Sequence, residues 1–96
     1  MSEKQPCVYM LASAYYGTLY IGVSSNLRRR VWEHKNHITT GFSEKYKVDR
    51  LVWYELYDSM YQAISREKNL KNWKRQWKIS LIEKQNPNWV DLYPGL

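Results

Sequence analysis

V-Y-M-L-A-S-A-Y-Y-G-T-L-Y-I-G-V, residues 8–23, decides the fold because it predicts a β-hairpin. The two ends of this stretch, residues 8–12 and 18–23, have the length and the content of β-branched and aromatic residues that are typical of strands. The segment between them contains Gly17, which can adopt the positive φ that a tight bend often requires. The chain is therefore expected to begin with two adjacent antiparallel strands.

A short basic helix is expected directly after the hairpin. Ser24 and Ser25 are good N-caps for a helix that starts near Asn26 and runs to about Lys35. The polar segment over residues 36–47, which contains a glycine, is typical of a loop. We therefore expect one helix and one loop before the next strand.

The second half of the chain predicts one more strand and two more helices. Residues 51–57 are rich in aromatic residues, and bulky neighbours on both faces favour a central position in the sheet. Asp58 or Ser59 caps a helix that runs to about Lys74. A third helix, over residues 77–84, ends where Asn-Pro stops it. The expected fold is α+β, with a small three-stranded antiparallel sheet and helices packed on it.

Length and charge narrow the classes of function. With 96 residues, the chain is expected to form a single domain over residues 1–96. A formal net charge of +6 indicates a polyanionic partner, because a basic surface attracts phosphate backbones. The aromatic fraction of 16% suits either a small core or base stacking, so composition alone does not separate these two uses.

Cys7 is the one cysteine, so an intrachain disulfide is excluded. No residue near it in the sequence would lower the pKa of its thiol, which indicates a small apolar strand residue and not a nucleophile. The N-terminal residues lack an apolar signal core, and no segment is long enough to span a bilayer. A reducing cytoplasm is the expected compartment.

Glu67 breaks the apolar pattern of the second helix. Met60, Ala63, Ile64 and Leu70 are spaced to form an apolar stripe, and Glu67 falls on that stripe. A carboxylate that points toward a core needs a cation, a hydrogen-bond partner or a metal, because desolvation of the charge is costly. Two interpretations stay open: a metal ligand, which the rest of the chain favours, or a partly buried ion pair with a nearby lysine or arginine.

The first helix carries a second pattern of this kind. Leu27 and Val31 define its inner face, and Arg30 and His34 lie on or beside that face, four residues apart. An inward guanidinium could bind a phosphate through two parallel hydrogen bonds. A lone histidine near a helix C-terminus often only complements the helix dipole, but its pairing with Arg30 favours a functional role.

Tyr9 and Tyr20 lie one on each arm of the predicted hairpin. Tyrosine on a strand usually packs, and a phenol with a pKa of about 10 needs nearby positive charge to act as a base near neutral pH. Arg30, His34 and a divalent metal could supply that charge. The cationic side chains expected to contact nucleic-acid phosphates are Arg28, Arg29, Lys35, Lys68, Lys71 and Lys74.

These residues together resemble the GIY-YIG nuclease family, in particular its short, stand-alone, excinuclease-like domain proteins. The resemblance spans nearly the whole chain, from Tyr9 to the tail N-P-N-W-V-D-L. The motifs that carry it are Tyr9, Y-I-G at 20–22, N-L at 26–27, Arg30, His34, R-E-K at 66–68 and L-K at 70–71. One departure is that V-Y-M at 8–10 stands where the family has G-I-Y, so only the tyrosine remains.

The resemblance implies a mixed sheet flanked by helices and metal-dependent hydrolysis of DNA. It implies one cleft formed by Tyr9, Tyr20, Arg30, His34 and Glu67. Glu67 would be the one protein ligand to Mg²⁺ or Mn²⁺, and a single carboxylate suits Mg²⁺, which keeps several waters. Arg30 would neutralise charge on phosphorus, and His34 would assist proton transfer or orient a phenol. One of the two tyrosines would position or deprotonate the attacking water, and the choice between them stays open.

Some members of the family use an asparagine near the C-terminus to shape the site. Asn86 and Asn88 are candidates, but N-P-N-W is equally typical of a helix stop, so neither joins the catalytic set. Relatives usually gain specificity from an attached DNA-binding domain, and none is expected in these residues. Cleavage is therefore expected to be structure-selective or weakly specific, unless a protein partner or a homodimer supplies more.

Two other classes of protein compete with the nuclease. The first is a non-catalytic nucleic-acid-binding module that uses the same cations together with exposed aromatic rings. The inward position of Glu67 argues against it, because a phosphate binder gains nothing from a carboxylate there. The second is an interaction protein with an aromatic patch, and the concentration of basic residues around the predicted cleft argues against that.

Overall fold

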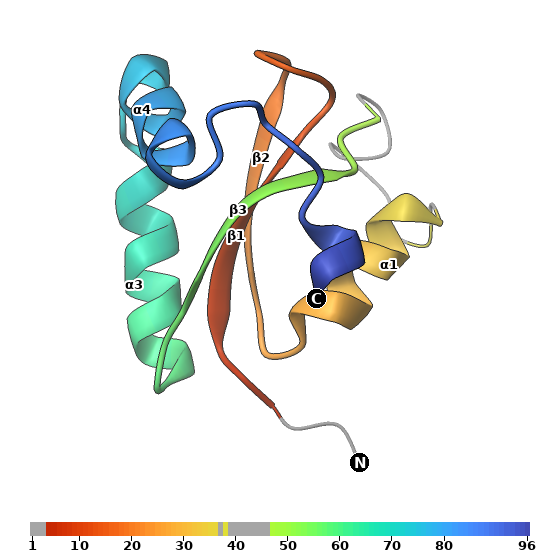
Figure 1. The fold of residues 1–96 in the computed structure, drawn as a ribbon. Coiled ribbons are helices and arrows are strands. Elements are labelled where there is room, and N and C mark those ends of the chain that lie inside the picture. The colour runs from red at the N-terminus through yellow and green to blue at the C-terminus, as the bar shows by residue number, and fades with distance from the viewer. Residues whose placement is uncertain (1–3, 37, 39–46) are drawn as a thin grey trace.

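A three-stranded sheet forms the centre of the fold in the computed structural model, which describes residues 4–36, 38 and 47–96 (Figure 1). The strands are β1 (Cys7–Ala12), β2 (Leu19–Ser24) and β3 (Arg50–Leu56). The helices are α1 (Leu27–Lys35), α3 (Met60–Lys71), α4 (Arg75–Gln85) and the 3-10 helix η1 (Tyr93–Gly95). The predicted α+β class is confirmed.

The strand order is β2-β1-β3, and both described pairings are antiparallel. The sheet is thus antiparallel over its described strands and not mixed. The prediction that the third strand lies at the centre is wrong, since β1 holds that position. The physical reason is that β1 is apolar on both of its faces, so its six residues are all buried.

The bend between β1 and β2 is built differently from the prediction. The positive φ, of 58°, belongs to Tyr16 and not to Gly17. Gly17 is required for another reason: a Cβ atom on it would lie 2.3 Å from the Ser13 hydroxyl oxygen and 2.8 Å from the Ala14 nitrogen. The glycine therefore serves the close approach of the two ends of the turn.

The helix caps agree with the sequence in part. Asn26, and not a preceding serine, caps α1: its side chain accepts a hydrogen bond from the Arg29 amide at 3.2 Å. Ser24 supports this cap, because its hydroxyl oxygen accepts a hydrogen bond from the Asn26 amide at 2.9 Å. Ser59 caps α3, which confirms one of the two predicted residues.

The break between the second and third helices comes earlier in the sequence than expected. α3 ends at Lys71, because the backbone turns at Asn72 and its amide bonds back to Asn69 and Leu70. α4 then begins at Arg75, with Lys74 in extended conformation before it. Most of the predicted loop over residues 36–47 lies outside the described residues.

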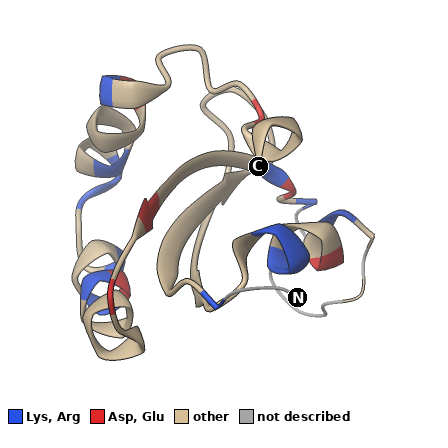
Figure 2. Cartoon of the chain, turned by 60° about the horizontal axis from the view of Figure 1, so that its bottom comes forward, with Lys and Arg blue, Asp and Glu red and all other residues tan. Residues whose placement is uncertain are grey.

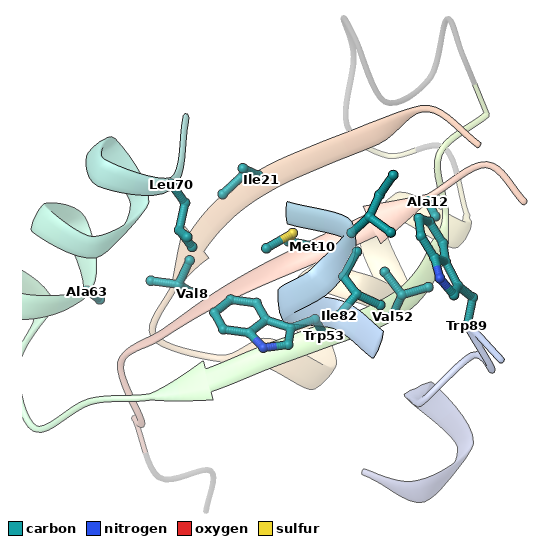
Figure 3. Packing of buried hydrophobic residues seen from close by; sticks show 11 residues of the cluster. Val8, Met10, Ala12, Ile21, Val52, Trp53, Ala63, Leu70, Ile82 and Trp89 are labelled. Atoms are coloured by element: carbon teal, nitrogen blue, oxygen red, sulfur yellow. The ribbon is translucent and has the colours of Figure 1, made fainter. Parts of the chain in front are cut away.

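Helices cover both faces of the sheet, and each face has its own buried cluster. Figure 1 shows α3 and α4 on one side of the strands and α1 on the other. Val8, Met10 and Ala12 of β1 pack with the buried residues of α3 and α4, as Figure 3 shows for Leu70 and Ile82. The intervening residues Cys7, Tyr9 and Leu11 belong to the cluster that contains Leu27 and Val31 of α1. Strand alternation therefore directs Tyr9 toward α1.

Cys7 is fully buried, and burial raises the pKa of its thiol to about 11. The thiol donates to the Ser24 carbonyl oxygen at 3.3 Å. The expectation that it packs as a small apolar residue is confirmed, and its raised pKa disfavours a thiolate. In the part of the chain that the structure describes, no helix has the length and apolar character needed to cross a membrane.

Candidate active site

The Tyr9 side chain links β1 to α1 through a polar contact inside the fold. Tyr9 is 1% exposed, and its hydroxyl oxygen lies 3.2 Å from Nε2 of His34, which is also buried. Arg30, one helical turn before His34, lies close enough to the same phenol for its charge to act on it. The result is a chain of contacts, Arg30–Tyr9–His34, held by two elements from different parts of the sequence.

Gly22 makes room for this phenol. It lies opposite Tyr9 in the β1–β2 register, and a Cβ atom on it would stand 2.5 Å from the Tyr9 hydroxyl oxygen and 3.0 Å from the ring of Tyr20. Real Cβ atoms do not approach so closely, so a side chain here would displace the phenol. The glycine of Y-I-G therefore has a packing reason that the sequence alone did not reveal.

If the chain cleaves phosphodiesters, as the family resemblance implies, Gly22→Ala should lower cleavage by about 10²-fold, because misplacing a reacting or orienting group by about 1 Å has that effect. Overpacking should also lower the free energy of unfolding by about 1–3 kcal/mol. Gly95→Ala is the matched control, since a Cβ atom there meets nothing within 4 Å. Cleavage rates and urea denaturation measure both effects; an active Gly22→Ala protein would show that the position of the phenol is unimportant.

Tyr20 lies beside this chain of contacts on the outer strand β2. Its ring centroid is 6.3 Å from that of Tyr9 and 5.3 Å from that of His34. Unlike Tyr9, it is only partly buried, and it lines a surface hollow of about 280 Å³. The other lining residues are Leu19, Ile21, Lys71 and Lys78. A ligand in this hollow would therefore reach Tyr20 more easily than Tyr9.

Burial sets the protonation states of the Tyr9–His34 pair. Burial, with Tyr20 as a second cause, raises the pKa of Tyr9 above the ordinary phenol range, although Arg30 opposes this. Burial first and the charge of Arg30 second lower the pKa of His34, against the opposing effect of Glu33. Near neutral pH the phenol therefore keeps its proton and the imidazole is neutral, with an acceptor nitrogen.

This geometry predicts a pH dependence of stability. The folded pKa of His34 lies below the ordinary value of 6.5, so the unfolded chain binds more protons in that range. The contribution of His34 to the free energy of unfolding is thus fully present above pH 6.5. It decreases as the pH falls through that value toward the folded pKa. We expect His34→Gln to flatten this part of the curve in urea denaturation. The loss caused by Asp91, whose folded pKa lies below 3.8, should persist at lower pH. An unchanged curve would contradict the assigned state of His34.

Arg30 differs from its two neighbours in its contacts. Its side chain is 44% exposed and pairs with Oε1 of Glu33 at 3.3 Å, in addition to its contact with Tyr9. Arg29 pairs with Oε2 of the same carboxylate at 3.3 Å, and Arg28 donates to the carbonyl oxygen of Leu96. Arg30 therefore lies at the border of the inner face of α1, and is not buried within it.

Glu33 is a site residue that the sequence reasoning missed. It accepts from both Arg29 and Arg30, and with them it lines a second hollow of about 240 Å³. A glutamate at i+3 and i+4 from two arginines is a recognisable helical ion-pair pattern. The signal was available in the sequence, and it indicates a carboxylate that orients the guanidinium of Arg30.

Glu67 projects from the inner face of α3, between the fully buried Ala63 and Leu70. Its side chain is only 15% exposed, and Oε2 pairs with Nζ of Lys71 at 3.1 Å. The local ion pair that the sequence left open is therefore present. Met60 and Ile64, in contrast, are exposed, so the predicted stripe is wrong at these two positions. The buried face follows the i, i+4, i+7 spacing of residues 63, 67 and 70 instead.

Lys71 connects Glu67 to the hollow of Tyr20, since it pairs with the carboxylate and lines the hollow. Among the described residues, no three His, Cys, Asp or Glu side chains converge as a metal cage. A single, largely buried carboxylate whose partner Lys71 lines a surface hollow suits a hydrated Mg²⁺, which uses one or two carboxylates and takes phosphate oxygens from the substrate. The donor set fits such an ion and does not fit a fully protein-ligated one.

Lys35, which the sequence placed in the phosphate-binding set, forms an ion pair with the C-terminal segment. Its ammonium donates to Oδ2 of Asp91 at 2.5 Å and to the carbonyl oxygen of Asp49 at 3.0 Å, and it lies over the ring of Tyr93. Asp91 also accepts from the Leu51 amide, so the C-terminal segment ties α1 to β3. Its charge is thus engaged in holding α1 in place, and its contact with nucleic-acid phosphates stays a prediction.

Asn86 has a structural role in this fold. It is buried, its Nδ2 donates to the carbonyl oxygens of Val52 and Val90, and its Oδ1 accepts from the Val90 amide. These contacts tie the end of α4 to β3, whereas Asn88 is exposed. The omission of both asparagines from the catalytic set stays a prediction.

The other predicted phosphate-binding cations lie on α1, on α3 and in the segment between α3 and α4. Figure 2 shows Lys and Arg on α1 and, on the other side of the sheet, along α3, α4 and the segment that joins them. Lys68 and Lys74 are exposed, as are Arg28 and Arg29. Positive charge thus occurs on both sides of the edge where β2 places Tyr20.

Comparison with known proteins identifies the class. Residues 5–80 match the model of the GIY-YIG catalytic domain, so the chain belongs to the GIY-YIG family of nucleases. Among similar proteins, a UPF0213 protein of Staphylococcus saprophyticus is 30% identical over 66 residues, which cover 69% of this chain and 80% of the relative. A UPF0213 protein of Staphylococcus aureus is 29% identical over 69 residues, covering 72% and 84% of the two chains. No solved structure matches the chain.

Proposed function

We propose that this chain is a divalent-metal-dependent endonuclease that hydrolyses phosphodiester bonds in DNA. The observation that carries the proposal is the Arg30–Tyr9–His34 chain of contacts beside the more accessible phenol of Tyr20. A guanidinium, two phenols and a neutral imidazole gathered on the α1 face of the sheet can supply phosphate binding and proton transfer to or from a water.

Tyr20 is the phenol that we assign to the attacking water. It lines a hollow where a substrate can lie, whereas the Tyr9 hydroxyl is buried and its raised pKa keeps its proton in place. Tyr9 instead holds Arg30 and His34 in register. The neutral imidazole of His34, in ring contact with Tyr20, can take up a proton as the reaction proceeds.

Arg30 is the group that we assign to the scissile phosphate. Its exposed guanidinium is held by Glu33 and Tyr9, so its orientation is set before substrate binds. Glu67 is the residue that would hold Mg²⁺ or Mn²⁺. When bound, such an ion supplies positive charge that stabilises the phosphate and the leaving oxygen.

The surface cations favour DNA as the partner and a weakly specific mode of binding. Phosphate contacts carry no base information, so Arg28, Arg29, Lys68 and Lys74 would position a DNA backbone without reading its sequence. Selectivity would then follow from the shape of the DNA. A protein partner or a second copy of the chain could add specificity.

A panel of DNA substrates tests the proposal. Supercoiled, branched and single-stranded DNA should be incubated with the purified protein, with and without Mn²⁺. We expect metal-dependent nicking of at least one of these forms. DNA binding without nicking of any form would instead support the non-catalytic binding module.

The three consecutive arginines provide a sharper test of the site. Arg30→Lys keeps the charge but loses the planar two-point contact with phosphate. We expect it to lower the cleavage rate by about 10²-fold or more while changing ground-state DNA affinity little. Arg28→Lys and Arg29→Lys are matched controls and should change neither quantity by more than about twofold. Equal kinetic losses at all three positions would indicate a diffuse basic patch.

A further inference from the structure

Trp77 is a large apolar residue that lies outside the buried core. Its side chain lies on the first turns of α4 and is 54% exposed, whereas Trp53 and Trp89 are almost completely buried. Tryptophan is usually well buried, so a large exposed ring is a candidate contact surface. None of the groups assigned to cleavage above accounts for it.

The ring of Trp77 is nevertheless held in place. Trp73 contacts it edge to face, with ring centroids 6.1 Å apart and planes at 83°. Trp73 is itself fixed, because its Nε1 donates to Oδ1 of Asn69 at 2.9 Å and the guanidinium of Arg66 lies 5.2 Å from its ring. An exposed ring supported in this way is pre-organised for binding, since little rotamer freedom is left to lose.

Lysine side chains lie next to the Trp77 ring and in the hollow of Tyr20. The ammonium of Lys74 lies 5.7 Å from the centroid of Trp77. Lys78, the next residue along α4, lines the hollow that also contains Lys71 and Tyr20. The exposed tryptophan is thus joined to the hollow of Tyr20 by a run of lysines, without an intervening acidic side chain in the lining of that hollow.

We propose that Trp77, with Lys74 and Lys78, forms a binding site for a nucleotide whose base is unpaired, next to the phosphate that is cleaved. The base stacks on the indole, and the two ammonium groups bind the phosphates on either side of it. This inference rests on the proposed nuclease function, because it places the site along the same DNA strand that enters the hollow of Tyr20.

The chemistry of the surface favours a nucleotide over a protein partner. Aromatic rings flanked by lysines are the arrangement with which proteins bind single strands, where stacking tolerates any base. A paired base stays stacked inside its duplex and does not offer its face to Trp77, so the site distinguishes unpaired from paired DNA. The other exposed aromatic pair, Tyr15 and Tyr16, lies beside the carboxylate of Glu83, which disfavours a polyanion there.

Binding should be measured without divalent metal, by fluorescence anisotropy of labelled single-stranded, flapped and fully paired DNA of equal length. Trp77→Ala should weaken binding of single-stranded and flapped DNA by about tenfold or more and change duplex binding by less than about twofold. Trp77→Phe, which keeps a ring, should bind single-stranded DNA with an affinity between those of the native protein and Trp77→Ala. Tyr61→Ala, an exposed aromatic at the opposite end of α3 from Lys71, is the control and should change nothing.

Abasic nucleotides test the same site without altering the protein. Replacing the bases of a single strand by abasic spacers keeps the phosphates, so it should weaken binding to the native protein and have no further effect on Trp77→Ala. Two results would overturn the proposal. One is that Trp77→Ala weakens binding of duplex and single-stranded DNA equally. The other is that the native protein binds abasic and normal single strands with the same affinity. These binding experiments contain no metal and do not depend on cleavage. If the proposed nuclease function fails, the nicking assay shows no cleavage, while the protein still distinguishes unpaired from paired DNA.

Discussion

Glu67→Gln is expected to remove divalent-metal-dependent cleavage, lowering the rate on the order of 10³-fold or more while DNA binding stays within about twofold. Losing one preorganised electrostatic group typically lowers a rate by about 10²–10³-fold, and Glu67 is the single carboxylate assigned to the metal. Glutamine keeps the size of the side chain and can still accept from Lys71, so the fold should persist. Single-turnover cleavage and anisotropy measure the two quantities.

Lys71→Met separates the two interpretations of Glu67. It breaks the same ion pair but leaves the carboxylate in place. If Glu67 serves only that ion pair, both variants should behave alike. If Glu67 holds the metal, Lys71→Met should keep metal-dependent cleavage at saturating DNA, with weaker DNA binding as its main defect. If both variants lose metal-dependent cleavage, the assignment of Glu67 as the metal ligand is contradicted.

Tyr20→Phe is expected to lower turnover by about 10²-fold or more at saturating DNA, the usual scale for loss of a positioned proton-transfer group. The ring is kept, so its contacts with Tyr9 and His34 should survive and DNA affinity should change little. Tyr9→Phe should have a smaller effect on turnover, because its hydroxyl orients Arg30 and His34 and does not face the hollow. Cleavage rates across a range of pH would measure both.

The pH profile distinguishes the two phenols further. Tyr20→Phe should alter the profile as well as the maximum rate, since the group that gives up or accepts a proton is gone. Tyr9→Phe should mainly shift the limb that reports His34, whose lowered pKa depends on this buried environment. A nearly normal Tyr20→Phe together with an inactive Tyr9→Phe would reverse the assignment.

The fold could be predicted to the level of its elements, because strand alternation and helix caps are local signals. Strand order was predicted wrongly, since the bulky aromatic residues of β3 suggested a central strand, whereas β1, which has no charged residue, is the strand buried on both faces. The turn at Tyr16 and Gly17 shows the same limit. A requirement for close approach and a requirement for positive φ both select glycine in the sequence.

Sequence patterns nominated the candidate residues, but their relative positions could not be read from the sequence. The spacing of Arg30 and His34 indicated a shared helix face, yet their meeting at the Tyr9 hydroxyl depends on the β1–β2 register and on space at Gly22. Lys35 shows the opposite case. Its charge suggested phosphate binding, but its ammonium forms an ion pair with a carboxylate 56 residues away in the sequence. A local sequence pattern cannot predict a pair so far apart.

The most direct test of the central claim is single-turnover cleavage of end-labelled DNA by the native protein over a titration of Mn²⁺, with protein in excess of DNA. The account predicts discrete cleavage products whose rate rises with Mn²⁺ to a plateau and disappears in chelator, at constant DNA occupancy. Full occupancy of the DNA with no Mn²⁺-dependent product at any metal concentration would contradict it.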